Sequence, residues 1–400
     1  MNELNERILQ EANDITTQLT EWRHELHKHP ELGFELDFTR QYVHDELVKL
    51  GLDPQPCGRS GWTVVLGNPK GKTIMLRADM DALPLMEDTD VTFKSEHPGK
   101  MHACGHDMHT SMLLGAAKLL KEHEEELEGC VKLMFQPAEE ICQGAKDMVD
   151  AGVLENPKVD AASMIHVASG MPFPTGLLII TPGKGGASSS TEFEITVKGK
   201  GGHGAMPAMS IDPITAIVHI HEALQEIHAR ELDLGGYLTI TVCQIHSGEA
   251  SNIIPETATM SGTIRAMSVD VQEWAKTRIQ EISENISAAF RTQVEVRYPK
   301  SIPPLIVDDA MSDSAHTLMK ELLGDSTMLM PKDVKGGGSE DFAEIALKVP
   351  SVAMFLAAGS TNDGYNYPAH HPKVRFDERV LPIGTAAHTY FAIRWLQENK

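Results

Sequence analysis

The sequence predicts an α/β fold, in which a main α/β domain with a mixed, largely parallel sheet carries an inserted ferredoxin-like α+β domain. At 400 residues the chain is longer than a single core usually fills. Short apolar strands alternate with amphipathic helices, which is typical of parallel stretches of sheet. The order β-α-β-β-α-β over residues 191–298 is the ferredoxin-like arrangement. We therefore expect the main domain at 1–183 and 299–400, and the inserted domain at 184–298.

The first part of the chain contains alternating helices and strands. Apolar residues at helical spacing, beginning with Leu4 and Ile8, predict a helix over 3–29 that Pro30 ends. A second helix is expected over 37–50, followed by Gly51. The further expected elements are strands 62–67 and 73–78, helix 107–125, strand 130–135, helix 144–151 and strand 160–167.

The composition shifts to Gly, Ala and Ser over 183–190, which indicates a linker into the inserted domain. The elements expected in that domain are strand 191–199, helix 211–229, strands 237–245 and 257–266, helix 270–290 and strand 293–298. Beyond it, the α/β pattern resumes with helix 310–323, the loop 336–341, strand 351–356 and helix 381–398.

The charge of the chain makes some partners unfavourable. The 57 acidic residues outnumber the 35 Lys and Arg, which gives a net charge of -22. Such a field repels phosphate groups, so we expect neither nucleic acid nor an anionic membrane as a partner. The N-terminus has no apolar signal-peptide segment, and no apolar run reaches the roughly 18 residues of a membrane span. Five cysteines without a disulfide pattern predict a reduced, cytoplasmic protein.

The stretch from Met101 to His109 carries three imidazoles, a thiol and a carboxylate within nine residues. Cys104 and His106 lie on either side of Gly105, which allows a tight turn that aims both side chains at one point. Sulfur and imidazole nitrogen together suit zinc-like divalent ions. The alternative is a helix N-terminus that carries histidines without a metal. Beside the two ligands, we expect Asp107 to cap the helix that follows.

Other metal-ligand types follow the carboxyl ends of predicted strands. Asp81, the pair Glu139-Glu140 and His166 each do so, at the edge where open α/β sheets bind ligands. With His370 in a proline-flanked loop, the candidate ligands are Cys104, His106, Glu140, His166 and His370. Five ligands suffice for one crowded site or for two metals about 3.5–4 Å apart, and Asp81 would orient one of the ligands.

The pair Glu139-Glu140 suggests hydrolytic chemistry. Adjacent residues leaving a strand point in different directions, so one carboxylate can bind metal while its neighbour faces a bound water. A carboxylate in that place takes the proton of the water and passes it to a leaving amine. An acidic first turn of a helix is the alternative explanation.

The inserted domain offers candidates for substrate binding. His203 lies in the glycine-rich loop 199–204, from which it would donate a hydrogen bond to a developing oxyanion. Asn252 and Arg265 would bind a substrate carboxylate. A turn residue and a solvated strand charge are the alternatives for these two.

Six motifs together resemble those of the M20 metallopeptidase family, in its amidohydrolase branch of hippurate hydrolases, N-acyl-amino-acid amidohydrolases and auxin-conjugate hydrolases. They are Arg-Ala-Asp-Met-Asp-Ala-Leu-Pro (77–84), the stretch 101–109, Gln-Pro-Ala-Glu-Glu (136–140), Gly-Gly-His-Gly-Ala-Met-Pro (201–207), Asn-Ile-Ile-Pro (252–255) and Gly-Ser-Glu-Asp-Phe (338–342). The resemblance implies a catalytic domain with two metals and a smaller lid domain that mediates dimerisation.

Carried over to this chain, the resemblance makes Cys104 the bridging metal ligand, where other branches use Asp. His106, Glu140, His166 and His370 complete the ligand set, which the resemblance implies as a whole. Glu139 becomes the general base, and His203 acts on the partner's active site across a dimer. The tail departs from the usual Leu-His-Asn/Ser-Pro, because it reads Ala-His-His-Pro over 369–372. Register favours His370 as the ligand, with His371 as its competitor.

The sequence therefore predicts a cytoplasmic, metal-dependent amidohydrolase that cleaves N-acyl amino acids to a carboxylic acid and a free amino acid. The expected cofactors are two divalent ions per subunit, from among Zn, Mn, Ni and Co. The expected assembly is a homodimer or a higher homo-oligomer formed through the lid. The alternatives are a dipeptidase of the same family and a metal-binding family member without catalysis.

Overall fold

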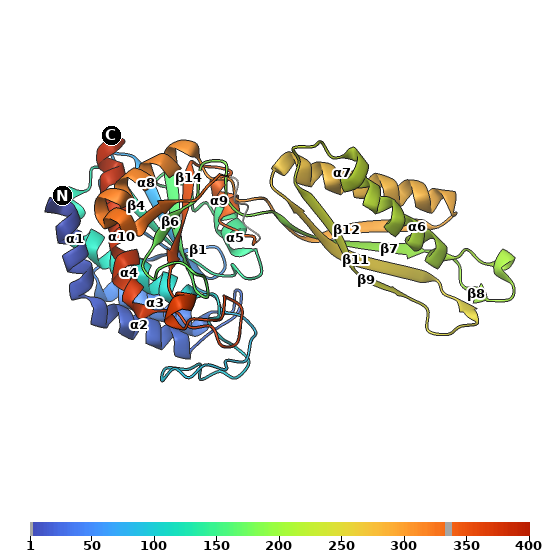
Figure 1. The fold of residues 1–400 in the computed structure, drawn as a ribbon, viewed down its shortest axis with the longest axis horizontal. Coiled ribbons are helices and arrows are strands. Elements are labelled where there is room, and N and C mark those ends of the chain that lie inside the picture. The colour runs from blue at the N-terminus through green and yellow to red at the C-terminus, as the bar shows by residue number, and fades with distance from the viewer. Residues whose placement is uncertain (1–2, 333–337) are drawn as a thin grey trace. The chain divides into compact units, whose positions relative to one another are not determined.

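The computed structural model describes residues 3–332 and 338–400 (Figure 1). The described residues fall into two compact units. The main unit lies within Met1–Gly186, Ile306–Val334 and Glu344–Lys400, and the inserted unit lies within Ala187–Leu305 and Lys335–Ala343. The predicted loop 336–341 lies partly outside the described residues, because its first two glycines fall among residues 333–337.

The main unit is built on an eight-stranded sheet in the order β1-β2-β4-β3-β5-β14-β6-β13. Its strands are β1 (Gln55–Cys57), β2 (Gly61–Gly67), β3 (Thr73–Asp79), β4 (Cys130–Gln136), β5 (Ala161–Ala168), β6 (Leu178–Ile180), β13 (Thr327–Leu329) and β14 (Ser351–Ala357). The central pairs β4–β3, β3–β5 and β5–β14 are parallel, whereas β1–β2, β2–β4 and β14–β6 are antiparallel. Every residue of β3 and β4 is buried, as expected for strands covered on both faces.

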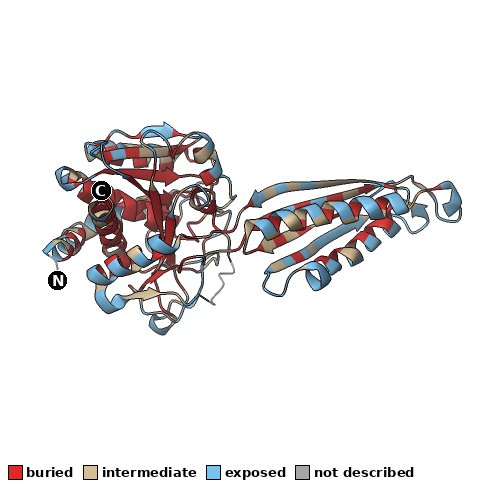
Figure 2. Cartoon of the chain, turned by 90° about the horizontal axis from the view of Figure 1, so that it is seen from above, coloured by how far each residue is buried: buried red, intermediate tan, exposed pale blue. Residues whose placement is uncertain are grey.

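Helices surround this sheet, and Figure 2 shows its strands largely buried, whereas the helices have both buried and exposed faces. The helices are α1 (Glu3–Asp14), α2 (Thr16–Lys28), α3 (Asp37–Lys49), α4 (His106–Glu122), α5 (Gly144–Asp150), α8 (Asp309–Leu323), α9 (Ala343–Ala346) and α10 (Leu381–Glu398). The prediction of one helix over 3–29 was wrong, because the chain breaks at Ile15. The break lets α1 pack on α10 while α2 packs on α4, which a continuous apolar spacing does not reveal.

The inserted unit has the predicted β-α-β-β-α-β order. It consists of β7 (Ser190–Lys198), α6 (Pro213–Glu226), β9 (Leu238–Ser247), β11 (Thr257–Ala266), α7 (Val269–Ala289) and β12 (Gln293–Ile302), with the short strands β8 (Gly202–His203) and β10 (Ile253–Ile254). The antiparallel sheet has the order β12-β7-β11-β9 and forms its own core with α6 and α7. The strand predicted to end at 298 continues to Ile302.

The predicted fold class is confirmed by this mixed sheet together with a separate antiparallel sheet. The short strands β1, β6, β8, β10 and β13 were not predicted, because two or three residues carry too little pattern to be recognised. Among the described residues, no helix is long and apolar enough to cross a membrane. The parallel pairing of β3, β4 and β5 brings their carboxyl ends to one edge of the sheet, where the predicted ligands follow.

Candidate metal centre

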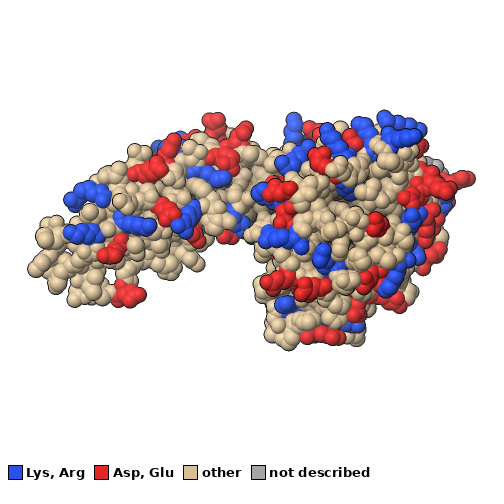
Figure 3. Space-filling view, turned by 180° about the vertical axis from the view of Figure 1, so that it is seen from behind, with Lys and Arg blue, Asp and Glu red and all other residues tan. Residues whose placement is uncertain are grey.

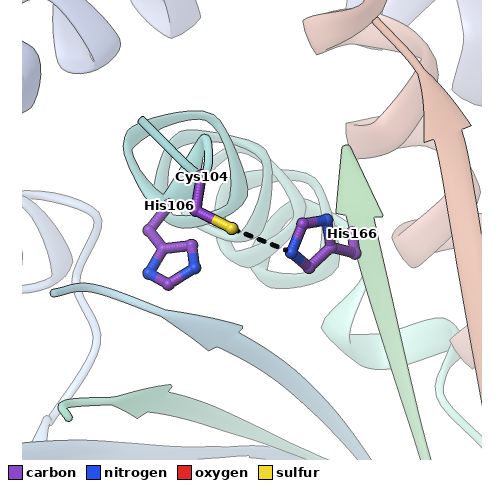
Figure 4. Close-up of side chains that lie close together, drawn as sticks. All are labelled: Cys104, His106 and His166. Carbon is purple, nitrogen blue, oxygen red and sulfur yellow. Dashed lines mark hydrogen bonds between the residues drawn. The ribbon is translucent and has the colours of Figure 1, made fainter. Parts of the chain in front are cut away.

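The predicted ligands of the main unit meet at this edge. These residues form three overlapping groups, and within each group the donor atoms lie within 4.8 Å of one another. The groups are Cys104, His106 and His166; His106, Glu139 and Glu140; and Cys104, Glu140 and His370. Because the groups share members, they form one continuous constellation. Figure 4 shows the sulfur of Cys104, from the turn before α4, pointing toward the ring of His166 on β5, with the His106 ring nearby. The Cys104 Sγ to His166 Nε2 distance is 3.5 Å.

His106 presents one ring nitrogen to the centre of this constellation. Its Nδ1 lies 2.7 Å from the carbonyl oxygen of Asp81, so Nδ1 carries a proton and donates it there. Its Nε2 is buried and has no hydrogen-bond partner among the described residues. A buried imidazole nitrogen without a partner is costly unless a ligand occupies it, so His106 fits a metal ion.

Glu140 supplies a second orphaned donor. Its Oε1 is buried and lacks a hydrogen-bond partner within the part of the chain that the structure describes. Burial raises the pKa of this carboxyl group, and the neighbouring His106 and His370 only partly oppose that rise. A carboxylate in such a place needs a cation to stabilise its charge. The donor set of thiol, imidazoles and carboxylate matches the ligands that zinc-like ions prefer.

Asp81 holds two parts of the constellation in place. Its Oδ1 accepts a hydrogen bond from the backbone N–H of Glu139 at 2.9 Å, and its Oδ2 accepts one from that of Glu140 at 3.1 Å. Its own carbonyl oxygen orients the His106 ring. The sequence predicts that Asp81 orients a ligand, and the geometry adds that it fixes the turn carrying both glutamates.

The backbone is strained at three positions in or next to the predicted ligands. Ala138 and Cys142 have φ values of 57° and 54°, and His370 has a φ of 66°. Non-glycine residues seldom adopt this left-handed conformation, and they do so mainly where function requires a particular side-chain direction. Glu139 and Glu140 both lie on this turn, and both carboxylates approach His106 Nε2, with Glu139 Oε2 at 3.9 Å and Glu140 Oε1 at 3.8 Å.

His370 and His371 play different roles in the structure. His370 Nε2 lies 3.5 Å from Glu140 Oε2, and its backbone N–H donates to Ala103 O at 2.8 Å. The ring of His371 instead stacks on Tyr367 with a centroid distance of 4.3 Å, and its Nδ1 accepts from the backbone N–H of Lys373. The geometry therefore favours His370 as the metal ligand.

Asp79 and His109 extend the site, although neither was a predicted site residue. His109 Nδ1 lies 2.6 Å from Asp79 Oδ1, and His109 Nε2 accepts from the backbone N–H of Val167 at 2.8 Å. Asp79 also accepts from Arg77 at 2.5 Å. His109 thus fixes the strand segment next to His166. The spacing of His106 and His109 by three residues on one helix face was the signal available for finding it.

The prediction that Asp107 caps α4 was wrong. The residue before the helix is Gly105, and no side chain caps that end. Asp107 is fully buried and accepts from Arg23 Nε at 3.1 Å and from His27 Nδ1 at 2.9 Å. Burial would raise its pKa, but Arg23 and His27 outweigh burial and hold the pKa well below its usual range. Asp107 therefore links α2 to the metal-ligand loop, the segment that carries Cys104 and His106.

Of the three predicted residues of the inserted unit, His203 and Asn252 lie close together, whereas Arg265 lies apart from them. His203 on β8 pairs with Ile253, beside Asn252, and Asn252 O accepts from Gly204 N at 2.8 Å. Arg265 lies near the opposite end of β11, where it donates to Ser189 O and Ser339 Oγ. Arg265 follows Thr257 by eight positions along the extended strand, which is a distance of about 26 Å. Within one chain, Asn252 and Arg265 therefore cannot bind the same carboxylate.

The family model for peptidase family M20/M25/M40 matches residues 75–394. The chain belongs to this family. It is 37% identical over 398 residues to thermostable carboxypeptidase 2 of Saccharolobus solfataricus, covering 98% of this chain and 99% of the relative. It is also 37% identical to the IAA-amino acid hydrolase ILR1-like 4 of Arabidopsis thaliana (98% and 89% covered). The N-acetylcysteine deacetylase of Bacillus subtilis is 34% identical (94% and 95% covered).

Solved structures share the whole architecture of this M20-family chain. An aminohydrolase from methicillin-resistant Staphylococcus aureus superposes with a TM-score of 0.91 at 31% identity, covering 99% of this chain and all of that one. A dinuclear metal-binding peptidase of the M20 family from Bacillus subtilis gives a TM-score of 0.80 at 29% identity, covering 96% and 99%. The chain is a metal-dependent hydrolase of amide bonds, so the predicted family, enzyme class and metal cofactor are confirmed.

Proposed function

We propose that this M20-family enzyme hydrolyses N-acyl amino acids to a carboxylic acid and a free amino acid, using two divalent ions. The constellation around Cys104, His106 and Glu140, with Glu139 beside it, carries the proposal. Two overlapping donor groups share Cys104 between His106 and His166 on one side and Glu140 and His370 on the other. That sharing supports Cys104 as the bridging ligand. Relatives named IAA-amino acid hydrolase and N-acetylcysteine deacetylase support an N-acyl amino acid as substrate.

Glu139 is the general base in this proposal. Divalent ions bound by the five ligands would acidify a water molecule and polarise the amide carbonyl. Glu139, on the strained turn that Asp81 fixes, accepts the proton of that water as the oxygen attacks the carbonyl carbon. The same carboxyl group then protonates the amide nitrogen, so that the C–N bond breaks and the amine leaves.

His203 acts in trans in this proposal, on the active site of a second copy. The side chain is exposed and belongs to the inserted unit rather than to the main unit. Ile214 and Val218 on α6, and Ile245 on the edge strand β9, are 40%, 43% and 45% exposed. Figure 3 shows that the end of the inserted unit that carries β8 is almost uncharged on the visible face. These features support a homodimer formed through the inserted unit.

A carboxypeptidase-type peptidase is the second candidate, because thermostable carboxypeptidase 2 is as similar to this chain as the hydrolase ILR1-like 4. Both activities break an amide bond next to a free carboxylate. Rates on N-acetyl and N-benzoyl amino acids, measured beside dipeptides and longer peptides, separate the two activities. Faster cleavage of peptides would favour the second candidate.

The substitution Glu139→Gln tests the mechanism. It keeps the size of the side chain but removes the proton acceptor, so we expect kcat to fall about 10²–10⁴-fold while bound metal is retained. Metal content is measured on the same preparation, with each of Zn, Mn, Co and Ni. Glu122→Gln, on the exposed far end of α4, is the matched control. A metal-loaded Glu139→Gln variant with nearly full amidase activity would exclude this mechanism.

We also infer that the enzyme works in a reducing, cytoplasmic compartment. The five cysteines are free in the structure, and Cys104 must keep its thiol to bind metal.

A further inference from the structure

A cleft of about 510 Å³ lies in the main unit, on the side of the metal-ligand loop where α2 packs. Its lining includes Arg23, Val91, Phe93, Tyr365, Arg375 and Phe376. The volume is in the range of small-molecule sites. Five of the nine lining residues are charged, and aromatic rings and Val91 provide the rest. None of the five metal ligands lines it.

The apolar wall of the cleft is held rigidly. The ring of Phe93 stacks on His24 with a centroid distance of 3.8 Å, and the guanidinium of Arg23 lies 5.1 Å from the same ring. Arg23 is 2% exposed, and it donates to Phe376 O as well as to Asp107. A wall that is already ordered offers a ligand apolar contact without a large loss of entropy.

The two carboxylates at the cleft both have positively charged or imidazole partners. Asp377 accepts from the guanidinium of Arg379 at 3.0 Å, and Glu378 pairs with Arg23 at 2.9 Å and His24 at 2.7 Å. Asp377 therefore presents little free negative charge to a ligand, whereas Glu378 shares Arg23 with Asp107 and keeps part of its charge.

Arg375 is the loosely held cation of the cleft. Among the described residues its carboxylate partner is Asp90, at 3.2 Å, and the side chains are 42% and 83% exposed. Exposed pairs of this kind contribute little free energy, so an incoming anion displaces Asp90 at small cost. The Tyr365 ring lies 5.6 Å from the Arg375 guanidinium and places an aromatic surface beside the positive charge.

The cleft is mechanically linked to the metal-ligand loop. Arg23 bonds to Asp107, which directly follows His106. Phe376 packs against Gly105, where an added Cβ would lie 3.2 Å from the ring atom Cζ. Gly105 has a φ of 88° and separates Cys104 from His106. Arg23 and Phe376 thus both contact the segment that carries the metal ligands Cys104 and His106.

We propose that this cleft binds a monocarboxylate with an apolar body, whose carboxylate pairs with Arg375 and whose body packs on Phe93 and Val91, and that binding slows catalysis through the Cys104–His106 loop. A bidentate Arg–carboxylate pair together with aromatic contact provides recognition of that ligand class. This ligand class includes the carboxylic acid that the proposed reaction releases, so the site would give feedback inhibition by the product. That last step rests on the proposed function.

The test measures binding of phenylacetate to the metal-loaded enzyme by titration calorimetry and by ligand-observed NMR. Phenylacetate also has access to the metal centre, so the variants decide which site is occupied. Arg375→Ala should weaken the cleft affinity roughly ten- to hundredfold, because it removes a charge-assisted pair. Lys373→Ala is the matched control. Lys373 lies two residues before Arg375 and is a similarly exposed cation that pairs with Asp88. Val91→Trp fills the cleft from a surface loop and tests the site without changing charge.

Inhibition kinetics supply the second readout. Phenylacetate should lower kcat in the wild type and in Lys373→Ala, and this effect should be lost in Arg375→Ala and Val91→Trp. Purely competitive inhibition that both variants retain would place the carboxylate at the metal centre only and overturn the proposal. Equal affinities of wild type and Arg375→Ala would overturn it as well. If no acyl amino acid is hydrolysed, the proposed function fails, while the binding measurement still decides the cleft.

Discussion

The metal-ligand edge of the main unit and the His203 turn of the inserted unit differ in how firmly their side chains are held. His106 is fully buried, its Nδ1 is fixed by Asp81, and its Nε2 is left without a hydrogen-bond partner among the described residues. His203 is exposed on a two-residue strand, and its Nδ1 accepts one hydrogen bond from the backbone N–H of Ala205 at 3.1 Å. The side chains of the metal-ligand edge are therefore held in position before any ligand binds, whereas the side chain of His203 is not.

The difference indicates where each region obtains its precision. The metal edge is fixed by its own chain, through β3, β4, β5 and hydrogen bonds to Asp81. A catalytic donor must be held close to its working position to be effective. Among the described residues of the inserted unit, a single hydrogen bond from Ala205 holds the side chain of His203. A second copy of the chain supplies the missing surroundings in the proposed dimer, which makes the comparison testable by mixing experiments.

Among the changes that test this comparison, His203→Ala is expected to have the largest effect. Loss of a donor to the developing oxyanion should lower kcat by about 10²–10³-fold without changing metal content. Hydrolysis of N-acetyl and N-benzoyl amino acids measures the loss. His246→Ala is the matched control, since His246 is an exposed histidine on β9 of the same unit.

Mixing two inactive variants decides whether His203 acts in trans. When His203→Ala and Glu139→Gln chains exchange subunits, a mixed dimer has one site with both groups intact. Equal mixing should therefore restore about a quarter of the wild-type activity, because half of the dimers are mixed and each has one working site. No recovery in dimers shown to be mixed would mean that His203 acts within its own chain.

A smaller effect is expected for Asp81→Asn, which loosens the organised region instead. The asparagine side chain keeps one oxygen that can accept a hydrogen bond. Its NH₂ group, however, would face a backbone N–H that in the wild type donates to the second carboxylate oxygen of Asp81. We expect metal affinity to fall about 10–100-fold, as is typical when groups supporting metal ligands are changed. Competition with a chromophoric chelator measures it, and the exposed Asp53→Asn serves as control. Unchanged affinity would show that the ligands hold their positions without Asp81.

The same contrast explains which site residues were predictable from the sequence. Cys104, His106, Glu139, Glu140 and His166 follow strand ends or a glycine turn, so local pattern and sheet topology suffice to bring them together. The roles of His109 and Asp107 depend on side-chain partners distant in the sequence, Asp79 and Arg23. Single-sequence patterns do not show such partners, and a local rule led to the wrong cap for α4.

The helices and strands likewise divide into those that the sequence predicts well and those that it does not. Long elements such as α10 and β11 have clear apolar periodicity, and their bounds agree with the prediction or differ by few residues. The break at Ile15 and the continuation of β12 to Ile302 are set by packing and strand pairing, which override local preference. The separation of Arg265 from Asn252 likewise follows from the register of β11 rather than from any motif.

The smallest expected effect concerns the stability of the inserted unit, and it compares two helix caps. Asp212 caps α6 by accepting from the backbone N–H of Ile214, and Asp308 caps α8 of the main unit by accepting from that of Met311, both at 2.9 Å. Each change to Ala should lower the free energy of unfolding by about 1 kcal/mol, measured by denaturant titration. Because the inserted unit has its own core, Asp212→Ala should leave metal affinity at the wild-type value. A loss of affinity as large as that of Asp81→Asn would show instead that the metal edge depends on the inserted unit for its order.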